Sequence, residues 1–153
     1  YERYRPAFQP KSAAMGLLEA TGQLQKSPVD VQAIAPAVSL GVQKVKLKSS
    51  YVLDFQCKDP VVYLALGQDP LEERLAMARA IGHLLYDNLY GKYGPSTLSP
   101  RVEAFARHLL APLPIVKEGM SDSSELANRL QVPYEVVVGQ LSSLMSFRKE
   151  GVL

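Results

Sequence analysis

The sequence predicts an α+β domain in which a small, mostly antiparallel three-stranded sheet packs against about six helices. Three observations carry this prediction. Several segments have apolar residues spaced by threes and fours, above all the stretch 71–88, LEERLAMARAIGHLLYDN. Three short segments rich in Val, Leu, Tyr and Phe lie between the helical segments. The chain has 153 residues, which fits one domain with a buried core.

The first part of the chain is expected to form an arm and two helices. Residues 1–12 mix Tyr, Arg and Pro without periodicity and are interpreted as an N-terminal arm. Apolar residues recur at helical spacing in 13–25 and 30–40, and Gly41 is expected to end the second helix in the left-handed conformation. The single domain is therefore expected to cover 13–153.

Three strands are expected next in the chain. Residues 42–47 alternate in part, and residues 51–57 alternate with Tyr51 and Leu53 on the apolar face. Residues 61–66 are more continuously apolar, which favours an internal strand.

The stretch 71–88 is the strongest helix prediction. Pro70 suits the first turn of a helix, and Glu72 and Glu73 favour the positive end of its dipole. Residues 89–99 are predicted to be a loop rich in Gly and Tyr. Further helices are predicted at 100–110, at 122–130 and from Pro133 to about 147, and the last two give residues 121–149 the pattern of a helix-turn-helix.

Composition describes an ordinary globular protein. Hydrophobic residues make up 47% and charged residues 21%, and the net charge of +2 is too slight to indicate a nucleic-acid partner. No apolar run approaches the ~20 residues of a membrane-spanning helix, so no membrane association is expected. The single cysteine, Cys57, and the lack of a recognisable signal peptide favour the cytoplasm.

A column of polar residues lies on the predicted central helix. Arg79, His83 and Asp87 follow one another at i, i+4 and i+8 and therefore stack along one helix face.

This stretch resembles the active-site helix of the ImmA/IrrE family of zinc metallopeptidases, which carries R-(F)-x-x-A-H-E-(L/I)-G-H-x-(L)-L. The matching residues are Arg74, Ala78, Ile81, Gly82, His83 and Leu85. The two positions that carry most of the chemistry do not match, because Arg79 replaces the first histidine and Ala80 replaces the catalytic glutamate of the HExxH motif. The resemblance implies a zincin-like minimal peptidase fold with a degenerate active site.

The resemblance extends over most of the chain after residue 13. Residues 28–30 and 40–42 fit a family turn and helix end, and 105–112 and 126–133 fit two later family patterns. On the family's second helix the implied third zinc ligand falls on Ser99, and a following Asn/Asp position falls on Glu103.

The two replaced residues remove the expected chemistry. In a zincin, two histidines and a third ligand hold Zn²⁺, and the glutamate beside the first histidine activates the metal-bound water. The guanidinium of Arg79 has no acceptor for a metal, and Ala80 has no group that takes a proton. No catalytic residue is therefore assigned. Arg79 is expected either to pair with Glu103 or Asp87 in place of the metal or to reach solvent.

A rearranged metal site is an alternative. His83, Asp87 and His108 are legitimate ligand types, so zinc is retained as a cofactor hypothesis beside the simpler interpretation of His83 as a packed, hydrogen-bonded histidine.

Two features bear on whether the chain binds a protein or DNA. The tyrosines Tyr86, Tyr90 and Tyr93 surround the end of the central helix and either border a partner groove or pack internally. The second helix of 121–149 is apolar and lacks basic residues before Arg148, which favours packing over DNA binding.

The sequence thus favours a non-catalytic protein-interaction or regulatory module. The resemblance implies stress-response or mobile-element transcriptional control and a partner such as a helix-turn-helix repressor. The alternatives are a metal-dependent hydrolase with rearranged ligands and a DNA-binding regulator that uses 121–149.

Overall fold

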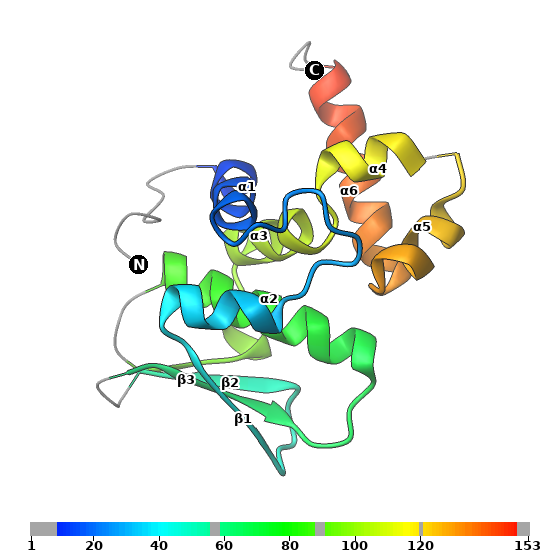
Figure 1. Cartoon of the computed structure of the whole chain (residues 1–153). Helices are drawn as coiled ribbons and strands as arrows, with labels where there is room; N and C mark the ends of the chain where they lie inside the picture. The colour runs from blue at the N-terminus through cyan, green and yellow to red at the C-terminus, as the bar shows by residue number, and fades with distance from the viewer. Residues whose placement is uncertain (1–8, 56–58, 88–90, 120, 150–153) are drawn as a thin grey trace.

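The computed structural model describes residues 9–55, 59–87, 91–119 and 121–149, and the side chains of this part as far as residue 145 (Figure 1). The chain has the predicted α+β class. A small sheet lies at one end of the molecule and the last three helices lie at the other (Figure 1). Among the described residues no helix is long and apolar enough to cross a membrane.

The sheet has four strands in the described part of the chain. They are β1 (Gly41–Val45), β2 (Tyr51–Asp54), β3 (Val61–Ala65) and β4 (Lys92–Tyr93). Their order is β1-β3-β2-β4, with β1 parallel to β3 and the other two pairs antiparallel. The predicted internal position of β3 is confirmed, because this strand pairs on both of its edges.

The prediction of three strands is corrected by β4. This strand has only two residues and lies in the glycine-rich 89–99 segment, so no alternation marks it in the sequence. The sheet is also mixed, because β3 inserts between β1 and β2 and runs parallel to β1 in the register Gly41↔Val61 to Val45↔Ala65.

The helices are α1 (Pro10–Ala20), η2 (Gln32–Val38), α2 (Pro70–Tyr86), η3 (Pro95–Thr97), α3 (Pro100–Leu110), α4 (Leu113–Gly119), α5 (Ser123–Leu130) and α6 (Tyr134–Lys149). The two η elements are 3₁₀ helices.

The first two helices differ from their predicted bounds. Helix α1 begins at Pro10, inside the predicted arm, because proline is tolerated in the first helical turn. The second element is 3₁₀ rather than α-helical and contains Pro36, whose missing N–H suits a short, tight helix. Its left-handed end is Ser39, with φ 56°, and not Gly41, which begins β1.

Helix α4 was not predicted. Two prolines, Pro112 and Pro114, indicate a helix stop, yet Pro114 lies in the first turn of α4, where it costs no hydrogen bond.

The core is built around α2. This helix packs against β2 and β3 on one side and against α3 on the other. Its Met77 and Ile81 are fully buried. On β2 the side chains alternate as predicted, with Tyr51 and Leu53 buried under α2 and Val52 half-buried on the opposite face.

Helices α2 and α3 approach closely at Gly82. A Cβ added there would lie 2.9 Å from Val102 Cγ1 and 3.2 Å from Phe105 Cδ1. The glycine therefore sets the spacing between α2 and α3, and with it the distance between polar side chains on the two helices.

The C-terminal helices form a compact pair joined by a turn. Gln131 ends α5 in the left-handed conformation, with φ 55°. Val136, Val137 and Leu144 of α6 are buried and belong to the core, whereas Val138 and Met145 of the same helix are exposed. Arg74 of α2 fixes this corner, because its guanidinium donates to the backbone carbonyls of Gln131, Leu130 and Val29 at 2.9, 3.3 and 2.7 Å.

Candidate functional site

Helix α2 places the predicted polar column beside the sheet and α3. Its first turn is fixed by Asp69, whose carboxylate accepts a hydrogen bond from the Leu71 N–H at 2.8 Å. The helix continues without a break to Tyr86, so Arg79 and His83 lie one turn apart, and Asp87 follows as the C-cap.

Arg79 pairs with Glu103 of α3. Its Nη2 lies 2.8 Å and its Nε 3.0 Å from the same carboxylate oxygen, Oε2. The two side chains are 22% and 25% exposed. Of the alternatives that the sequence left open, the structure selects the ion pair with Glu103. A cation therefore stands at the position that the resemblance assigns to the first zinc-binding histidine.

His83 is held at both ring nitrogens. Its Nδ1 lies 2.5 Å from Asp87 Oδ2, and its Nε2 lies 2.8 Å from the Tyr51 hydroxyl. A carboxylate only accepts hydrogen bonds, so Nδ1 carries the proton and Nε2 accepts the proton of the tyrosine hydroxyl. The three groups form a continuous chain from Tyr51 through His83 to Asp87.

The Tyr51 and His83 members of this chain are closed to solvent, and the Asp87 side chain is 22% exposed. His83 and Tyr51 are both fully buried, and the ring of Tyr93 stacks on the imidazole with centroids 5.5 Å apart. Burial lowers the pKa of His83, and the nearby Arg79 charge lowers it further, while Asp87 opposes both effects. Burial also raises the pKa of the Tyr51 hydroxyl. Both groups are therefore neutral at neutral pH, and the site holds a fixed hydrogen-bond pattern.

The two remaining degenerate positions have structural roles. Ala80 is fully buried against its neighbours and brings no polar atom to the site. Ser99, which falls at the implied third zinc ligand, is the N-cap of α3, and its hydroxyl accepts from the Val102 N–H at 3.2 Å.

His108 lies in a different environment, at the contact of α3 with α6. Its Nδ1 accepts from the Gln140 side-chain amide at 3.2 Å, and the same amide donates to the Ala111 carbonyl at 2.7 Å. Burial, with help from the charges of Arg107 and Lys11, lowers the pKa of His108 to about 4.

The three predicted residual metal ligands do not converge. His83 and Asp87 contact each other, whereas His108 contacts Gln140. Within the described ranges no group of three or more His, Cys, Asp or Glu side chains is arranged to hold a metal ion.

The predicted partner tyrosines make ring contacts within the chain. Tyr86 packs edge-on against Phe105, with centroids 6.0 Å apart, and the guanidinium of Arg101 lies 5.3 Å above its ring. Tyr93 stacks on His83 and meets Phe55 edge-on at 5.9 Å. Tyr90 lies outside the described residues.

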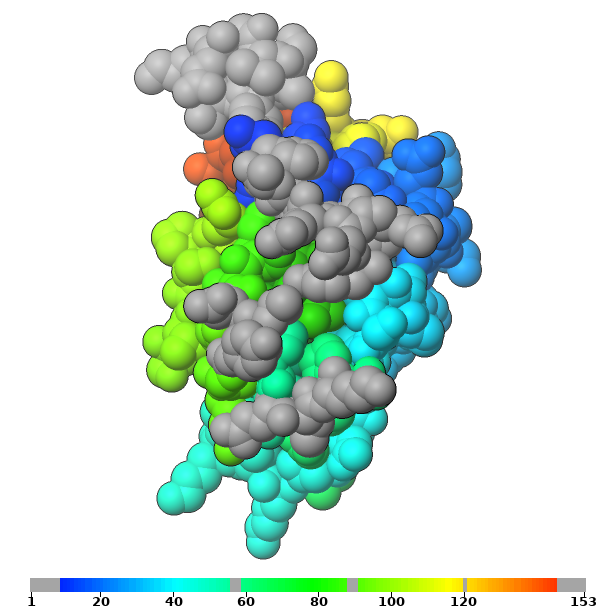
Figure 2. Space-filling model, turned by 90° about the vertical axis from the view of Figure 1, so that its left-hand side faces the viewer, coloured from blue at the N-terminus to red at the C-terminus, as the bar shows by residue number. Residues whose placement is uncertain are grey.

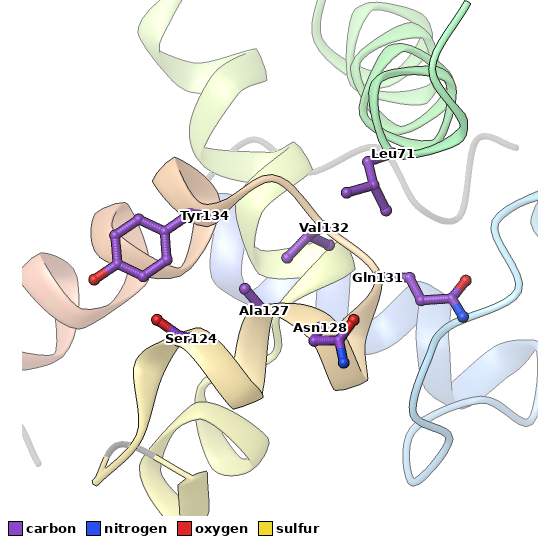
Figure 3. A pocket seen from close by; sticks show the side chains of 7 residues that line it. All are labelled: Leu71, Ser124, Ala127, Asn128, Gln131, Val132 and Tyr134. Carbon is purple, nitrogen blue, oxygen red and sulfur yellow. The ribbon is translucent and has the colours of Figure 1, made fainter.

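Two grooves lie near α2. A groove of about 380 Å³ follows the 92–97 segment beside β2 and includes Tyr93 in its lining. A larger groove of about 590 Å³ lies where the first turn of α2 meets α5 and α6 (Figure 3). Its lining residues are Leu71, Ser124, Ala127, Asn128, Gln131, Val132 and Tyr134.

The larger groove combines apolar and amide side chains. Figure 3 shows Tyr134 and Ser124 on one side and Leu71 and Gln131 on the other. Tyr134 is 51% exposed. The groove could not be predicted from the sequence, because only the tertiary fold brings Leu71 of α2 beside α5, α6 and the turn between them.

No protein-family model matches the chain, and no curated protein matches it significantly. The likeness to ImmA/IrrE peptidases therefore rests on the sequence patterns alone, which lie at 28–30, 40–42, 74–85, 105–112 and 126–133. Tyr51, the buried partner of His83, was not identified from the sequence, where it is one of two aromatic residues on the apolar face of a predicted strand.

Proposed function

We propose that this chain is a non-catalytic protein-interaction module built on an ImmA/IrrE-like peptidase framework. The observation that carries the proposal is the closed state of His83. Both of its ring nitrogens are engaged by Tyr51 and Asp87, and the side chain is fully buried. No lone pair of this histidine is free for a metal or a substrate proton.

The Arg79–Glu103 pair supports the same function. In the proposed framework the guanidinium supplies the positive charge that a metal ion supplies in an active peptidase, and Glu103 balances it. The pair joins α2 to α3, so the former reaction centre becomes a stabilising contact of the scaffold.

The larger groove is the proposed partner site. It has an apolar floor that includes Ala127 and Val132, and a rim that carries the amides of Asn128 and Gln131. Half-exposed Tyr134 at its edge has the amphipathic character of a binding anchor. The smaller groove beside Tyr93, nearer to the location predicted from the sequence, is the second proposed contact.

The proposed role is regulatory. In this role the chain binds a regulator such as a helix-turn-helix repressor and does not cleave it. This partner class rests on the sequence resemblance to the ImmA/IrrE family.

The test is site-directed photo-crosslinking in cells that express the chain. A photoreactive phenylalanine analogue replaces Tyr134 in the larger groove or Ser96 in the smaller one, and exposed Glu19 on α1 is the control position. We expect a discrete adduct from Tyr134 and none from Glu19, and mass spectrometry then identifies the partner.

The identified partner is then incubated with the purified chain. The proposal predicts direct binding that is weakened by Asn128→Arg, while the mass of the partner stays unchanged. Fragmentation of the partner, or equal adducts from every position including Glu19, would contradict the proposal.

A further inference from the structure

Among the residues that the structure describes, no strand pairs with the outer side of β1. Strand β1 pairs with β3 alone among the described strands. The exposed positions on it are Gly41, Gln43 and Lys44, and nothing in the described part of the chain extends the ladder beyond them. In Figure 1 the sheet lies at the end of the molecule opposite to α4–α6.

The backbone of this edge offers groups for one more strand. The Gly41 N–H bonds to the Pro60 carbonyl, and the Val45 carbonyl accepts from the Leu66 N–H. These residues therefore direct their polar groups toward β3. Because successive residues of a strand alternate in direction, the N–H and C=O groups of Val42 and Lys44 point outward. No other described residue hydrogen-bonds to them.

The edge is also strongly basic. Lys44 lies in β1, Lys46 and Lys48 follow at alternate positions in the segment after the strand, and all three are exposed. From residue 31 to residue 53 every charged residue is a lysine. Figure 2 shows long side chains of this cyan segment extending from one end of the molecule.

One carboxylate already contacts this row. Lys44 Nζ lies 3.2 Å from Glu73 Oε1 of α2, which fixes the side of the sheet to which Lys44 points. No carboxylate of the described residues pairs with Lys46 or Lys48. An acidic ligand thus finds two uncompensated ammonium groups next to outward-facing backbone groups.

We propose that the free edge of β1 binds an extended acidic peptide segment of another protein, which adds a strand beside Val42–Lys44 and pairs its acidic side chains with Lys46 and Lys48. Backbone hydrogen bonds supply the register, and alternate carboxylates match the alternate lysines. The free strand edge favours a peptide over a nucleic acid, whose backbone has no groups to continue a β-ladder. This surface goes beyond the proposed function, since β1 and β4 form opposite edges of the sheet and the β1 surface shares no lining residue with either groove.

Lysines on an edge strand also prevent the edges of two sheets from pairing and aggregating. If this were the only role of Lys44, Lys46 and Lys48, the edge would bind no ligand. The two roles differ in a binding experiment. A fluorescein-labelled peptide of alternating Glu and Thr is titrated with the full chain, and its fluorescence anisotropy is recorded. The comparison peptide alternates Glu and Pro, which keeps the charges but cannot form a β-ladder.

The proposal predicts saturable binding of the Glu–Thr peptide that weakens with added salt. Binding of the Glu–Pro peptide is expected to be at least about tenfold weaker, because only charge attraction remains. The double variant Lys46→Glu/Lys48→Glu is expected to weaken Glu–Thr binding by about tenfold or more. The matched control Lys26→Glu/Lys117→Glu removes two exposed lysines elsewhere and is expected to have less than about a twofold effect.

Three outcomes would overturn the proposal. They are no binding of the Glu–Thr peptide, equal binding of the two peptides, and tighter binding of a single-stranded oligonucleotide. The groove variant Asn128→Arg is expected to leave peptide binding unchanged. A failure of the proposal for the β1 edge can thereby be distinguished from a failure of the proposal for the larger groove.

Discussion

The guanidinium of Arg79 and the carboxylate of Glu103 meet at 2.8 Å across the contact between α2 and α3. One helical turn further along α2, His83 joins Asp87 to Tyr51. The two arrangements together satisfy the polar side chains that face this region from α2. The polar side chains of α2 that lie at the positions resembling a peptidase active site therefore make internal contacts with α3 and the sheet.

Breaking the Arg79–Glu103 pair is expected to destabilise the fold. Arg79→Ala leaves a partly buried carboxylate without its partner and should lower the free energy of unfolding by about 1–2 kcal/mol, a modest value because both side chains are about a quarter exposed. Urea unfolding of Arg79→Ala, Glu103→Gln and the double variant measures the coupling. A wild-type midpoint for Arg79→Ala would show that the pair contributes nothing.

Removing the Tyr51 hydroxyl tests the buried hydrogen-bond chain. Tyr51→Phe leaves His83 Nε2 without a partner in a fully buried site and is expected to cost about 1–3 kcal/mol. Tyr63→Phe on the open face of the sheet is the matched control and should change the free energy of unfolding by less than about 0.5 kcal/mol. Equal effects of the two substitutions would argue against a specific role for the hydroxyl.

The sequence identified this fold class and the central helix because their signals are local. The 3.6-residue spacing of 71–88 and the alternation of 51–57 follow from burial of one face. A helix and a strand form in these segments, with bounds Pro70–Tyr86 for α2 and Tyr51–Asp54 for β2. Elements fixed by tertiary contacts were missed. Strand β4 has two residues and exists because β2 lies beside it, and α4 begins among prolines that normally end helices.

Adding a methyl group at Gly82 is expected to force α2 away from α3. The new Cβ would lie 2.9 Å from Val102 Cγ1, so Gly82→Ala should destabilise the protein by about 1–3 kcal/mol despite the better helix propensity of alanine. Gly16→Ala is the matched control, because Gly16 lies in α1 with no atom within 4 Å of the added Cβ.

For Gly16→Ala we expect unchanged or increased stability, by up to about 1 kcal/mol. Thermal unfolding of the two variants compares them directly. If Gly82→Ala were as stable as Gly16→Ala, the close contact between α2 and α3 would be wrong.

Because of His108, the free energy of unfolding is expected to decrease as the pH is lowered. Its pKa of about 4 in the folded chain lies below the ordinary histidine value of about 6.5, so the unfolded chain binds more protons between these limits. Stability is therefore fully present above about pH 6.5 and falls as the pH drops toward 4, by on the order of 3 kcal/mol.

Urea unfolding at a series of pH values from neutral to about 4 measures this loss. His108→Gln removes the titrating group and should flatten the dependence, leaving the smaller contribution in the same direction from His83. An unchanged slope in His108→Gln would assign the acid sensitivity to other groups.

At the site, more of the residues than of their hydrogen-bond and ion-pair partners could be predicted from the sequence. Arg79 was expected to pair with Glu103 or Asp87, and the structure shows Glu103, because Asp87 is held by His83. Tyr51 could not be named, since its contact with His83 depends on how the sheet packs under α2. The groove at α5 and α6 was missed for the same reason.

The most direct test of the account is the zinc content of the purified chain after incubation with zinc and removal of the excess, measured by elemental analysis for wild type, His83→Ala and His108→Gln. The account predicts far less than one zinc ion per chain in all three, because His83 has no free nitrogen and the three predicted ligands do not converge. About one zinc ion per wild-type chain, lost in His83→Ala and kept in His108→Gln, would contradict the account and restore a metal-dependent function.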